Sequence, residues 1–324
     1  MSSIRVAAVQ AEPVWFDLAA TTEKTITLIA QAAAGGARLV AFPETWLPGY
    51  PGFIWGQSAL EQLPLVALYR SASPTVDGPE IAAIRAAAAA HEISVVLGFS
   101  ERDHGSLYMA QAIIGADGEL LLHRRKLKPT HVERTLFGES DGSGLAVVDS
   151  PLGRLGALNC WEHMQPLVKF AMYAQHEQIH VAGWPALTSP GTSLLPQLSG
   201  GACLTLSRAY ALEGSVFVLV PNQLFPRDPA MADATPPELC ALVYGPDGSI
   251  VSEPIDPDVE GIAYADLDLS AVSVAKTFAD PVGHYSRPDV FRLTVDRTPR
   301  PVVRLEGPAT EPPPAEVPEE IASA

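Results

Sequence analysis

Short apolar segments alternate along the chain with longer segments in which apolar residues recur at helical spacing. Among the first hundred residues, the apolar runs at 4–10, 38–42 and 93–99 have the length of buried strands. The alanine-rich segments 18–34 and 79–92 separate them and have the spacing of helices that pack on one face. This repeated strand, helix, strand order predicts a layered α/β fold.

The next two predicted strands depart from that order. Residues 107–114 and 119–124 are separated by a turn that contains Asp117 and Gly118. So short a connection implies that the two strands pair in antiparallel fashion. We therefore expect a mixed sheet rather than a purely parallel one.

The second half of the chain repeats the pattern of the first. It predicts strands at 156–159, 179–183, 215–220 and 261–268, helices at 164–175 and 201–213, and a hairpin over 240–251. Two similar halves would pack sheet on sheet with helices outside. From about residue 298 Pro, Glu and Ala dominate, so we expect one domain over 1–297 and a disordered tail over 298–324.

Composition narrows the class of protein. A content of 47% hydrophobic and 18% charged residues in 324 is ordinary for a soluble globular chain. The formal net charge of −16 argues against nucleic acid and against anionic membrane surfaces as partners. No apolar run is long enough to span a bilayer, and the N-terminus lacks the features of a signal peptide. We therefore expect a cytoplasmic protein.

The three cysteines bear on both location and chemistry. Cys160, Cys203 and Cys240 lie far apart without CxxC spacing, which argues against disulfides and a structural zinc site. Cys160 lies between a predicted strand and a predicted helix. Unpaired N–H groups at a helix N-terminus favour a thiolate, so Cys160 is a candidate nucleophile. Inert packing is the alternative, because cysteine is commonly buried.

Two further residues follow predicted strands. Glu44 lies in an aromatic loop after the strand at 38–42, where poor solvation would raise its pKa toward that of a general base. A loop-stabilising role is the alternative. Lys126 belongs to a basic run after the strand at 119–124; such a run is commonly a solvated face. Because α/β proteins assemble sites at strand ends, we expect Glu44, Lys126 and Cys160 to form one site.

These residues are a base, a cation and a thiol, a set that suits attack on a carbon bonded to nitrogen. A carboxylate can accept the thiol proton, and an ammonium can stabilise the negative charge that develops on the substrate. No histidine is as well placed for a Cys–His pair. His131 and His163 are therefore expected to be structural or peripheral.

Three motifs, AFPETWLPGYP, HRRKLKPTHVER and LGALNCWEHMQPL, together with DPVGHYSRPDV, resemble the nitrilase branch of the carbon–nitrogen hydrolases. The resemblance extends to about Val295 and implies a four-layer αββα sandwich with mixed sheets. It implies a catalytic triad of Glu44, Lys126 and Cys160, with Lys126 rather than Lys128 as the lysine.

The same resemblance implies roles for four more residues. Glu133 would orient Lys126 and the attacking water. The side chains implied to line the substrate pocket are those of Tyr50, Trp161 and Trp184. Core packing is the alternative for these aromatic residues.

Trp161 and Glu162 after the cysteine resemble nitrilases rather than amidases, and AMYAQHEQIHVAGWP resembles bacterial arylacetonitrilases. The resemblance implies that an organic nitrile, such as an arylacetonitrile, is converted to a carboxylic acid and ammonia through a thioimidate and a thioester. An amide by-product forms if the intermediate expels the thiolate instead of ammonia. No metal or organic cofactor is implied.

Other functions remain open at this stage. An amidase or a cyanide-hydrating enzyme would use the same triad, and a non-catalytic binding protein could share the fold. Disulfide exchange and cysteine proteolysis are more remote, because the CxxC motif and an oriented Cys–His pair are lacking. The resemblance also implies a homo-oligomer built from dimers, as a spiral or filament. The helix at 164–175 is the predicted contact, with intramolecular packing as the alternative.

Overall fold

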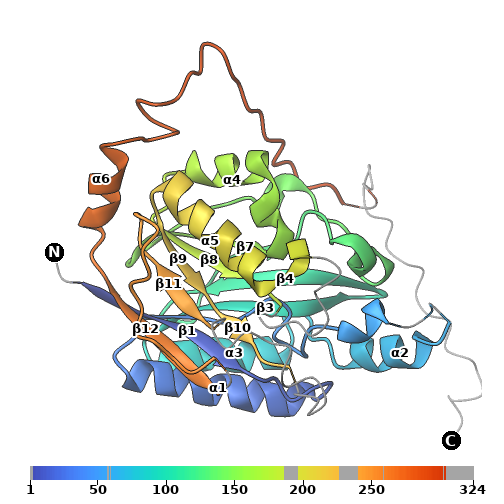
Figure 1. Cartoon of the computed structure of the whole chain (residues 1–324). Coiled ribbons are helices and arrows are strands. Elements are labelled where there is room, and N and C mark those ends of the chain that lie inside the picture. Colours follow the sequence, from blue (N-terminus) through green and yellow to red (C-terminus); the bar gives the residue numbers. More distant parts are fainter. Residues whose placement is uncertain are drawn as a thin grey trace, which may run out of the picture.

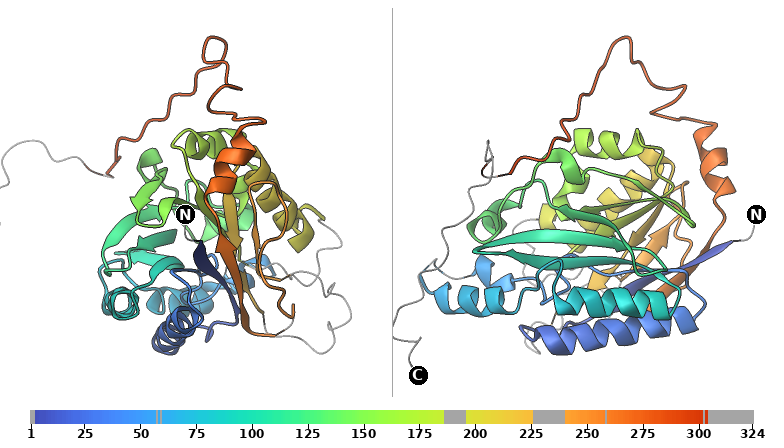
Figure 2. Two further views of the ribbon diagram at one scale, coloured as in Figure 1. Left: turned by 90° about the vertical axis from the view of Figure 1, so that its left-hand side faces the viewer. Right: turned by 180° about the vertical axis from the view of Figure 1, so that it is seen from behind.

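A computed structural model describes residues 3–56, 58, 60–185, 196–225, 240–257, 259–301 and 303. These residues form two mixed β-sheets with helices on their outer faces (Figures 1 and 2). Of the helices in these ranges, none has both the length and the apolar character that crossing a membrane requires.

The first sheet has the strand order β10-β1-β2-β3-β4-β5, with β12 also paired to β1. Its bounds are β1 Ile4–Ala11, β2 Leu39–Ala41, β3 Ser94–Asp103, β4 Ser106–Ile114, β5 Leu120–Arg125, β10 Asn222–Gln223 and β12 Gly261–Leu267. β1, β2 and β3 are parallel, whereas β3, β4 and β5 are antiparallel. The predicted mixed sheet is confirmed.

The second sheet has the order β11-β9-β8-β7-β6. Its bounds are β6 Val148–Ser150, β7 Gly153–Asn159, β8 Ile179–Gly183, β9 Phe217–Val220 and β11 Leu242–Tyr244. β7, β8 and β9 run parallel, and the two edge strands are antiparallel to their neighbours.

Helices cover the outer face of each sheet. α1 (Leu18–Ala34) and α3 (Pro79–Ala90) lie on the first sheet, and α4 (Pro166–Tyr173) and α5 (Gly200–Gly214) lie on the second (Figure 2). The remaining helices are α2 (Leu63–Ser71) and α6 (Ser270–Lys276), with short 3-10 helices η1 (Gly52–Trp55), η2 (His131–Thr135), η3 (Gly142–Gly144), η4 (Cys160–Met164) and η6 (Pro196–Leu198).

Alternating side chains along the strands build three hydrophobic layers. In β1, Ala7 and Val9 pack toward α1 and α3, whereas Val6 and Ala8 pack between the sheets. The outer face of the second sheet packs against α4 and α5 through residues such as Leu158. Because side chains on a strand alternate between its faces, each central strand contributes to two layers. The predicted four-layer αββα sandwich is confirmed.

Three details differ from the prediction. The halves of the chain do not form separate sheets, because β10 and β12 pair with β1 of the first sheet. The hairpin over 240–251 keeps its turn, but the only pairing beyond it is a single bridge between Tyr244 and Ile250. The helix predicted at 164–175 is shorter: α4 spans Pro166–Tyr173, and Cys160–Met164 before it form the separate 3-10 helix η4. The two are separate because the residue before a proline is disfavoured in a helix.

The division into a domain over 1–297 and a tail stays a prediction. α6 is the last helix in the described ranges, and the segment after it arches away from the sheets (Figure 1). Residues 298–301 and 303 have no helix or strand. The rest of the predicted tail lies outside the described residues.

A close backbone approach positions the loop that carries Glu44. Phe42 donates its N–H to Val96 at 2.8 Å, and Ser100 donates its N–H to Leu47 at 2.7 Å. Between these bonds, a Cβ atom on Gly98 would lie 2.0 Å from the carbonyl oxygen of Pro43. The loop can therefore lie against β3 because residue 98 has no side chain.

Substituting Gly98 with alanine is expected to destabilise the protein. The new methyl group must displace backbone rather than a flexible side chain, so we expect a loss of about 1–3 kcal/mol in the free energy of unfolding. Urea denaturation measures this change. Gly56→Ala is the matched control: a Cβ there meets nothing within 4 Å, and its effect should stay within about 0.5 kcal/mol. Equal effects of both changes would contradict the prediction.

Candidate active site

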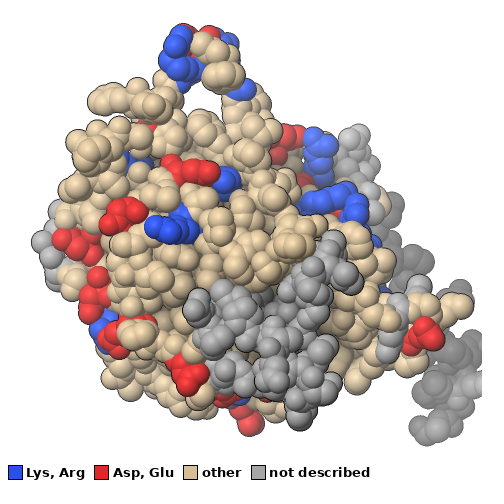
Figure 3. Space-filling view, viewed as in Figure 1, with Lys and Arg blue, Asp and Glu red and all other residues tan. Residues whose placement is uncertain are grey.

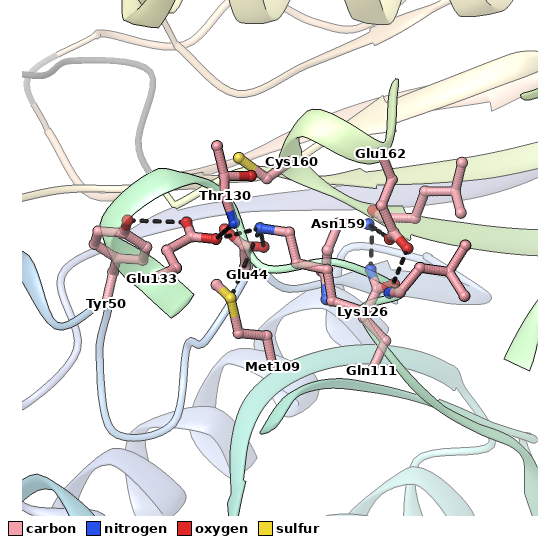
Figure 4. A network of polar contacts seen from close by, with 12 residues as sticks. Glu44, Tyr50, Met109, Gln111, Lys126, Thr130, Glu133, Asn159, Cys160 and Glu162 are labelled. Atoms are coloured by element: carbon pink, nitrogen blue, oxygen red, sulfur yellow. Dashed lines mark hydrogen bonds and ion pairs between the residues drawn. The ribbon is translucent and has the colours of Figure 1, made fainter. Parts of the chain in front are cut away.

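The three residues predicted from strand ends lie together in the structure. Glu44 follows β2, Lys126 follows β5 and Cys160 follows β7, so both sheets contribute to the cluster. Their side chains point toward one another (Figure 4). Glu44 is 0%, Lys126 1% and Cys160 4% exposed. Water is therefore largely excluded from this cluster, which strengthens the electrostatic interactions within it.

Lys126 lies between two carboxylates. Its Nζ is 3.0 Å from Oε1 of Glu44 and 2.8 Å from Oε2 of Glu133. Lys128 is half-exposed and pairs with Glu139 at the surface instead. The structure therefore brings Lys126, rather than Lys128, to Glu44 and Cys160.

The two carboxylates differ in how many donors they receive. Glu133 accepts from Lys126, from the backbone N–H of Thr130 at 2.6 Å and from the hydroxyl of Tyr50 at 3.0 Å. Glu44 accepts from Lys126 through Oε1, and its Oε2 has no hydrogen-bond partner among the described residues. Glu44 thus has a free oxygen that can take a proton, whereas both oxygens of Glu133 are occupied.

Cys160 is the first residue of η4, in a strained turn directly after β7. Its φ of 48° lies in the left-handed region, which costs a non-glycine residue about 1–2 kcal/mol. Sγ of Cys160 and one carboxylate oxygen each of Glu44 and Glu133 lie within 4.8 Å of one another. The turn therefore keeps the sulfur within reach of Glu44.

The sequence predicted that a helix N-terminus would favour the thiolate of Cys160, and the structure has a short helix at this position. η4 is a 3-10 helix of five residues, and burial raises the pKa of the Cys160 thiol well above its ordinary value although Lys126 opposes this. Burial also raises the pKa of Glu44 to about 8, against the opposing charge of Lys126. The resting thiol consequently needs a base, and Glu44 has a pKa suited to that task.

Lys126 stays charged in this buried cluster. Burial alone would lower its pKa, but electrostatic interactions with Cys160, Glu133 and Glu44 together raise the pKa well above the ordinary value. The ammonium is therefore a fixed positive charge beside the sulfur. Donor atoms of Glu44, Glu133 and Cys160 form the group that could bind a metal ion among the described residues. The lysine ammonium is already paired with both of those carboxylates and supplies a positive charge there.

A second buried ion pair joins the lysine strand to the cysteine turn. Nη2 of Arg124 donates to both carboxylate oxygens of Glu162, at 2.6 and 2.9 Å. The same carboxylate accepts from the backbone N–H groups of Leu127 at 3.0 Å and Asn159 at 2.8 Å. Because Arg124 and Leu127 flank Lys126 while Asn159 and Glu162 flank Cys160, this pair fixes the two segments to each other.

The predicted pocket aromatics lie in different surroundings. Tyr50 is buried, donates to Glu133 and accepts from the indole of Trp55. Trp184 is fully buried, donates to Ser207 and belongs to the apolar layer on the outer face of the second sheet. Trp161 is half-buried and packs against that layer. That Tyr50, Trp161 and Trp184 contact a substrate stays a prediction.

The two histidines set aside at the sequence level also differ in position. His131 is exposed and stacks on Trp55. His163 is fully buried, and its Nδ1 lies 2.7 Å from the carbonyl oxygen of Cys160. A histidine three residues after the candidate nucleophile was the one available signal for this contact in the sequence.

Known proteins similar to this chain cover most of its length. A family model described as carbon-nitrogen hydrolase matches residues 5–277. The chain is 49% identical over 306 residues to a Rhodococcus rhodochrous protein named aliphatic nitrilase, covering 91% of this chain and 83% of that protein. It is also 49% identical over 306 residues to an Aspergillus kawachii protein named arylacetonitrilase, covering 91% and 92%.

A solved structure agrees with the fold. The structure described as a carbon-nitrogen hydrolase from Helicobacter pylori G27 matches with a TM-score of 0.71 at 19% sequence identity. The match covers 90% of this chain and 97% of that one. At this identity the likeness bears on the fold alone.

Removing one partner of the buried Arg124–Glu162 pair should destabilise the protein strongly. Arg124→Met leaves the Glu162 carboxylate buried without its counter-charge, so we expect a loss of about 3–5 kcal/mol in the free energy of unfolding. Arg124→Met combined with Glu162→Gln removes the unpaired charge as well and should be more stable than Arg124→Met alone. Urea denaturation of both variants tests this order.

The exposed pair between Arg287 and Asp289 provides the control for this experiment. Their side chains are 66% and 63% exposed, so Arg287→Met should change the free energy of unfolding by less than about 1 kcal/mol. A double variant less stable than Arg124→Met would show that the buried charge is not the source of the loss.

Proposed function

Because the chain belongs to the carbon–nitrogen hydrolase family, we propose that it hydrolyses organic nitriles to carboxylic acids and ammonia, with Cys160 as the nucleophile. The observation that supports this most directly is the buried cluster in which the Lys126 ammonium lies between Glu44 and Glu133, beside the thiol. Such a cluster combines a nucleophile, a base and a positive charge in a buried site, where electrostatic interactions are strong.

In the first stage, Sγ of Cys160 forms a bond to the nitrile carbon while the free Oε2 of Glu44 accepts the thiol proton. The nitrile nitrogen gains negative charge as its triple bond becomes a double bond. Lys126 stabilises that charge. Glu44 then transfers the proton it accepted to the nitrogen, which completes a neutral thioimidate and returns Glu44 to its carboxylate form. Glu133 keeps the ammonium in place through its 2.8 Å ion pair.

In the second stage, water adds to the thioimidate carbon and ammonia leaves, so that a thioester remains on Cys160. A second water, deprotonated by Glu44, attacks the thioester and releases the carboxylic acid and the thiol. If the tetrahedral intermediate formed by the first water expels the thiolate instead of ammonia, the product is an amide.

Arylacetonitriles are the substrate class we propose. The relatives named aliphatic nitrilase and arylacetonitrilase are both 49% identical to the chain, so the proposal needs a test against both classes. An amidase using the same residues is the second candidate. The same thiol, base and ammonium can act on the carbonyl carbon of an amide, with ammonia as the leaving group.

Location and assembly remain proposals of the same kind. All three cysteines are free thiols, which fits the reducing cytoplasm. Acidic and basic side chains are interspersed on the described part of the face in Figure 3, which fits a small-molecule substrate better than nucleic acid.

Leu167 on α4 is 67% exposed and Phe170 36%, so α4 is the proposed contact of a homo-oligomer. Size-exclusion chromatography tests this contact through a Leu167→Glu variant.

Cys160→Ala should abolish nitrile hydrolysis, because the covalent stages need the sulfur. We expect a fall of about a thousandfold or more in kcat, measured with a panel of aliphatic, aromatic and arylacetonitriles while acid, amide and ammonia are all quantified. Ammonia released faster from amides than from nitriles would favour the amidase.

Cys240→Ala serves as the control, because it removes a half-buried thiol that lies outside the cluster. It should retain nitrile hydrolysis within about twofold of the unsubstituted protein. Circular dichroism establishes that both variants are folded. Nitrile hydrolysis that survives in the Cys160→Ala variant would remove the proposal.

The rate should depend on pH through Glu44. Because its pKa is raised to about 8 and the base must be deprotonated, kcat/KM should rise as the pH increases toward 8 and level off above it. Well below the pKa the rise should be about tenfold per pH unit. The midpoint belongs to the coupled cluster rather than to Glu44 alone.

Initial rates between about pH 5.5 and 9.5 at constant ionic strength give this profile. Samples incubated at each pH and assayed at about pH 8 control for irreversible inactivation. A kcat/KM that stays flat from about pH 5.5 upward would mean that the base has an ordinary carboxylate pKa, which contradicts the prediction.

A further inference from the structure

A chain of buried hydrogen bonds begins at the backbone of Cys160 and runs between the second sheet and its helices. The carbonyl oxygen of Cys160 lies 2.7 Å from Nδ1 of His163, and Nε2 of His163 lies 2.9 Å from Nε2 of His180. Nδ1 of His180 lies 2.7 Å from Oε1 of Glu177. His163 and His180 are 0% exposed and Glu177 is 1% exposed. The reaction stages above use none of these three side chains.

The carbonyl oxygen of Cys160 determines which atom donates and which accepts in every bond of this hydrogen-bond chain. A carbonyl only accepts, so His163 must carry its proton on Nδ1. A neutral imidazole has one N–H, so Nε2 of His163 accepts and Nε2 of His180 donates to it. Nδ1 of a neutral His180 then also accepts, and the donor has to be Glu177. A neutral chain therefore requires a protonated Glu177.

The surroundings favour that neutral state. Tyr210 donates its hydroxyl to Oε2 of Glu177 at 2.6 Å, so the carboxyl accepts at one oxygen and is free to donate from the other. Burial raises the pKa of Glu177 to about 8, which Tyr210 and Lys276 oppose. Burial also lowers the pKa of His163, to about 3, and the pKa of His180 well below its ordinary value.

The neighbouring elements prevent the three side chains from turning away. The His180 ring stacks on Tyr210 with 3.8 Å between centroids, and the His163 ring stacks on Trp184 with 5.2 Å. A Cβ atom on Gly156 of β7 would lie 1.9 Å from Oε1 of Glu177. Residue 156 thus has no side chain at the point where the carboxyl group lies against the strand.

We propose that Glu177, His180 and His163 are positioning residues, which act as a neutral, one-directional hydrogen-bond chain to hold the Cys160 carbonyl and thereby the strained turn that presents the sulfur. The φ of 48° at Cys160 is unfavourable by itself, and a donor locked onto its carbonyl compensates for it. This inference rests on the proposed function in that it takes Cys160 as the nucleophile.

Two substitutions of Glu177 separate the hydrogen bond from the volume of the side chain. In Glu177→Gln the amide N–H can donate to His180 while the amide oxygen accepts from Tyr210, so the direction of the chain is preserved. Glu177→Leu fills similar space but leaves Nδ1 of His180 without a donor. We expect Glu177→Gln to retain kcat within about twofold, and Glu177→Leu to lower kcat about tenfold or more with KM unchanged within about twofold.

The alkylation rate of Cys160 by iodoacetamide, followed by mass spectrometry, provides a readout that needs no nitrile. It should slow in Glu177→Leu in proportion to kcat and stay near the original rate in Glu177→Gln. Tyr173→Phe is the matched control. The Tyr173 ring packs on Tyr210, but its hydroxyl donates to Glu213 and not to a member of the hydrogen-bond chain. It should leave kcat and alkylation within about twofold.

The proposal is overturned if Glu177→Leu keeps the original kcat and alkylation rate, or if Glu177→Gln is as slow as Glu177→Leu. Should Glu177→Leu fail to fold, 15N NMR of the histidine-labelled unsubstituted protein decides. Protons on Nδ1 of His163 and Nε2 of His180, with Nδ1 of His180 bare, support the chain; a doubly protonated His180 overturns it. Neither readout depends on nitrile turnover, so failure of the chain is distinguishable from failure of the proposed function.

Discussion

The buried ammonium of Lys126 is the charge around which the rest of the structure is arranged. Removing an ion of this size from water costs several kcal/mol even after relaxation, and the loss is recovered only with well-placed counter-charges. Glu44 and Glu133 supply them at 3.0 and 2.8 Å. Two carboxylates around one cation leave the cluster short of positive charge, so an added proton is held tightly. The raised pKa values of Glu44 and of the Cys160 thiol follow from burial in this cluster.

A cluster of this kind needs a scaffold that does not let its members separate. β2, β5 and β7 end at the same place, and they belong to two sheets whose facing side chains form one apolar layer. The ion pair of Arg124 and Glu162 then links the segment after β5 to the turn after β7. That pair is itself buried, so the fold compensates for two separate sets of desolvated charges.

Local patterns predicted much of this arrangement. The strand and helix periodicities located α1 and β8 at their observed bounds, and placed Glu44, Lys126 and Cys160 at strand ends. Local patterns could not predict how distant segments pair. Periodicity indicates that β12 is a strand, but it does not indicate that β12 pairs with β1. The raised pKa of the Cys160 thiol could not be predicted from local patterns for a related reason. The helix signal is local, whereas the desolvation that outweighs it comes from residues throughout the chain.

The two glutamates at Lys126 show why residue type alone does not assign a role. Both are buried carboxylates paired with the same ammonium. Glu133 lies in η2, where the N–H of Thr130 reaches its side chain and the Tyr50 hydroxyl occupies the other oxygen. Glu44 lies in an extended loop, and its Oε2 has no such donor within the described ranges. Since a base needs a lone pair free for the incoming proton, the local backbone around each carboxylate distinguishes the proposed proton acceptor, Glu44, from Glu133, which is proposed to hold the lysine.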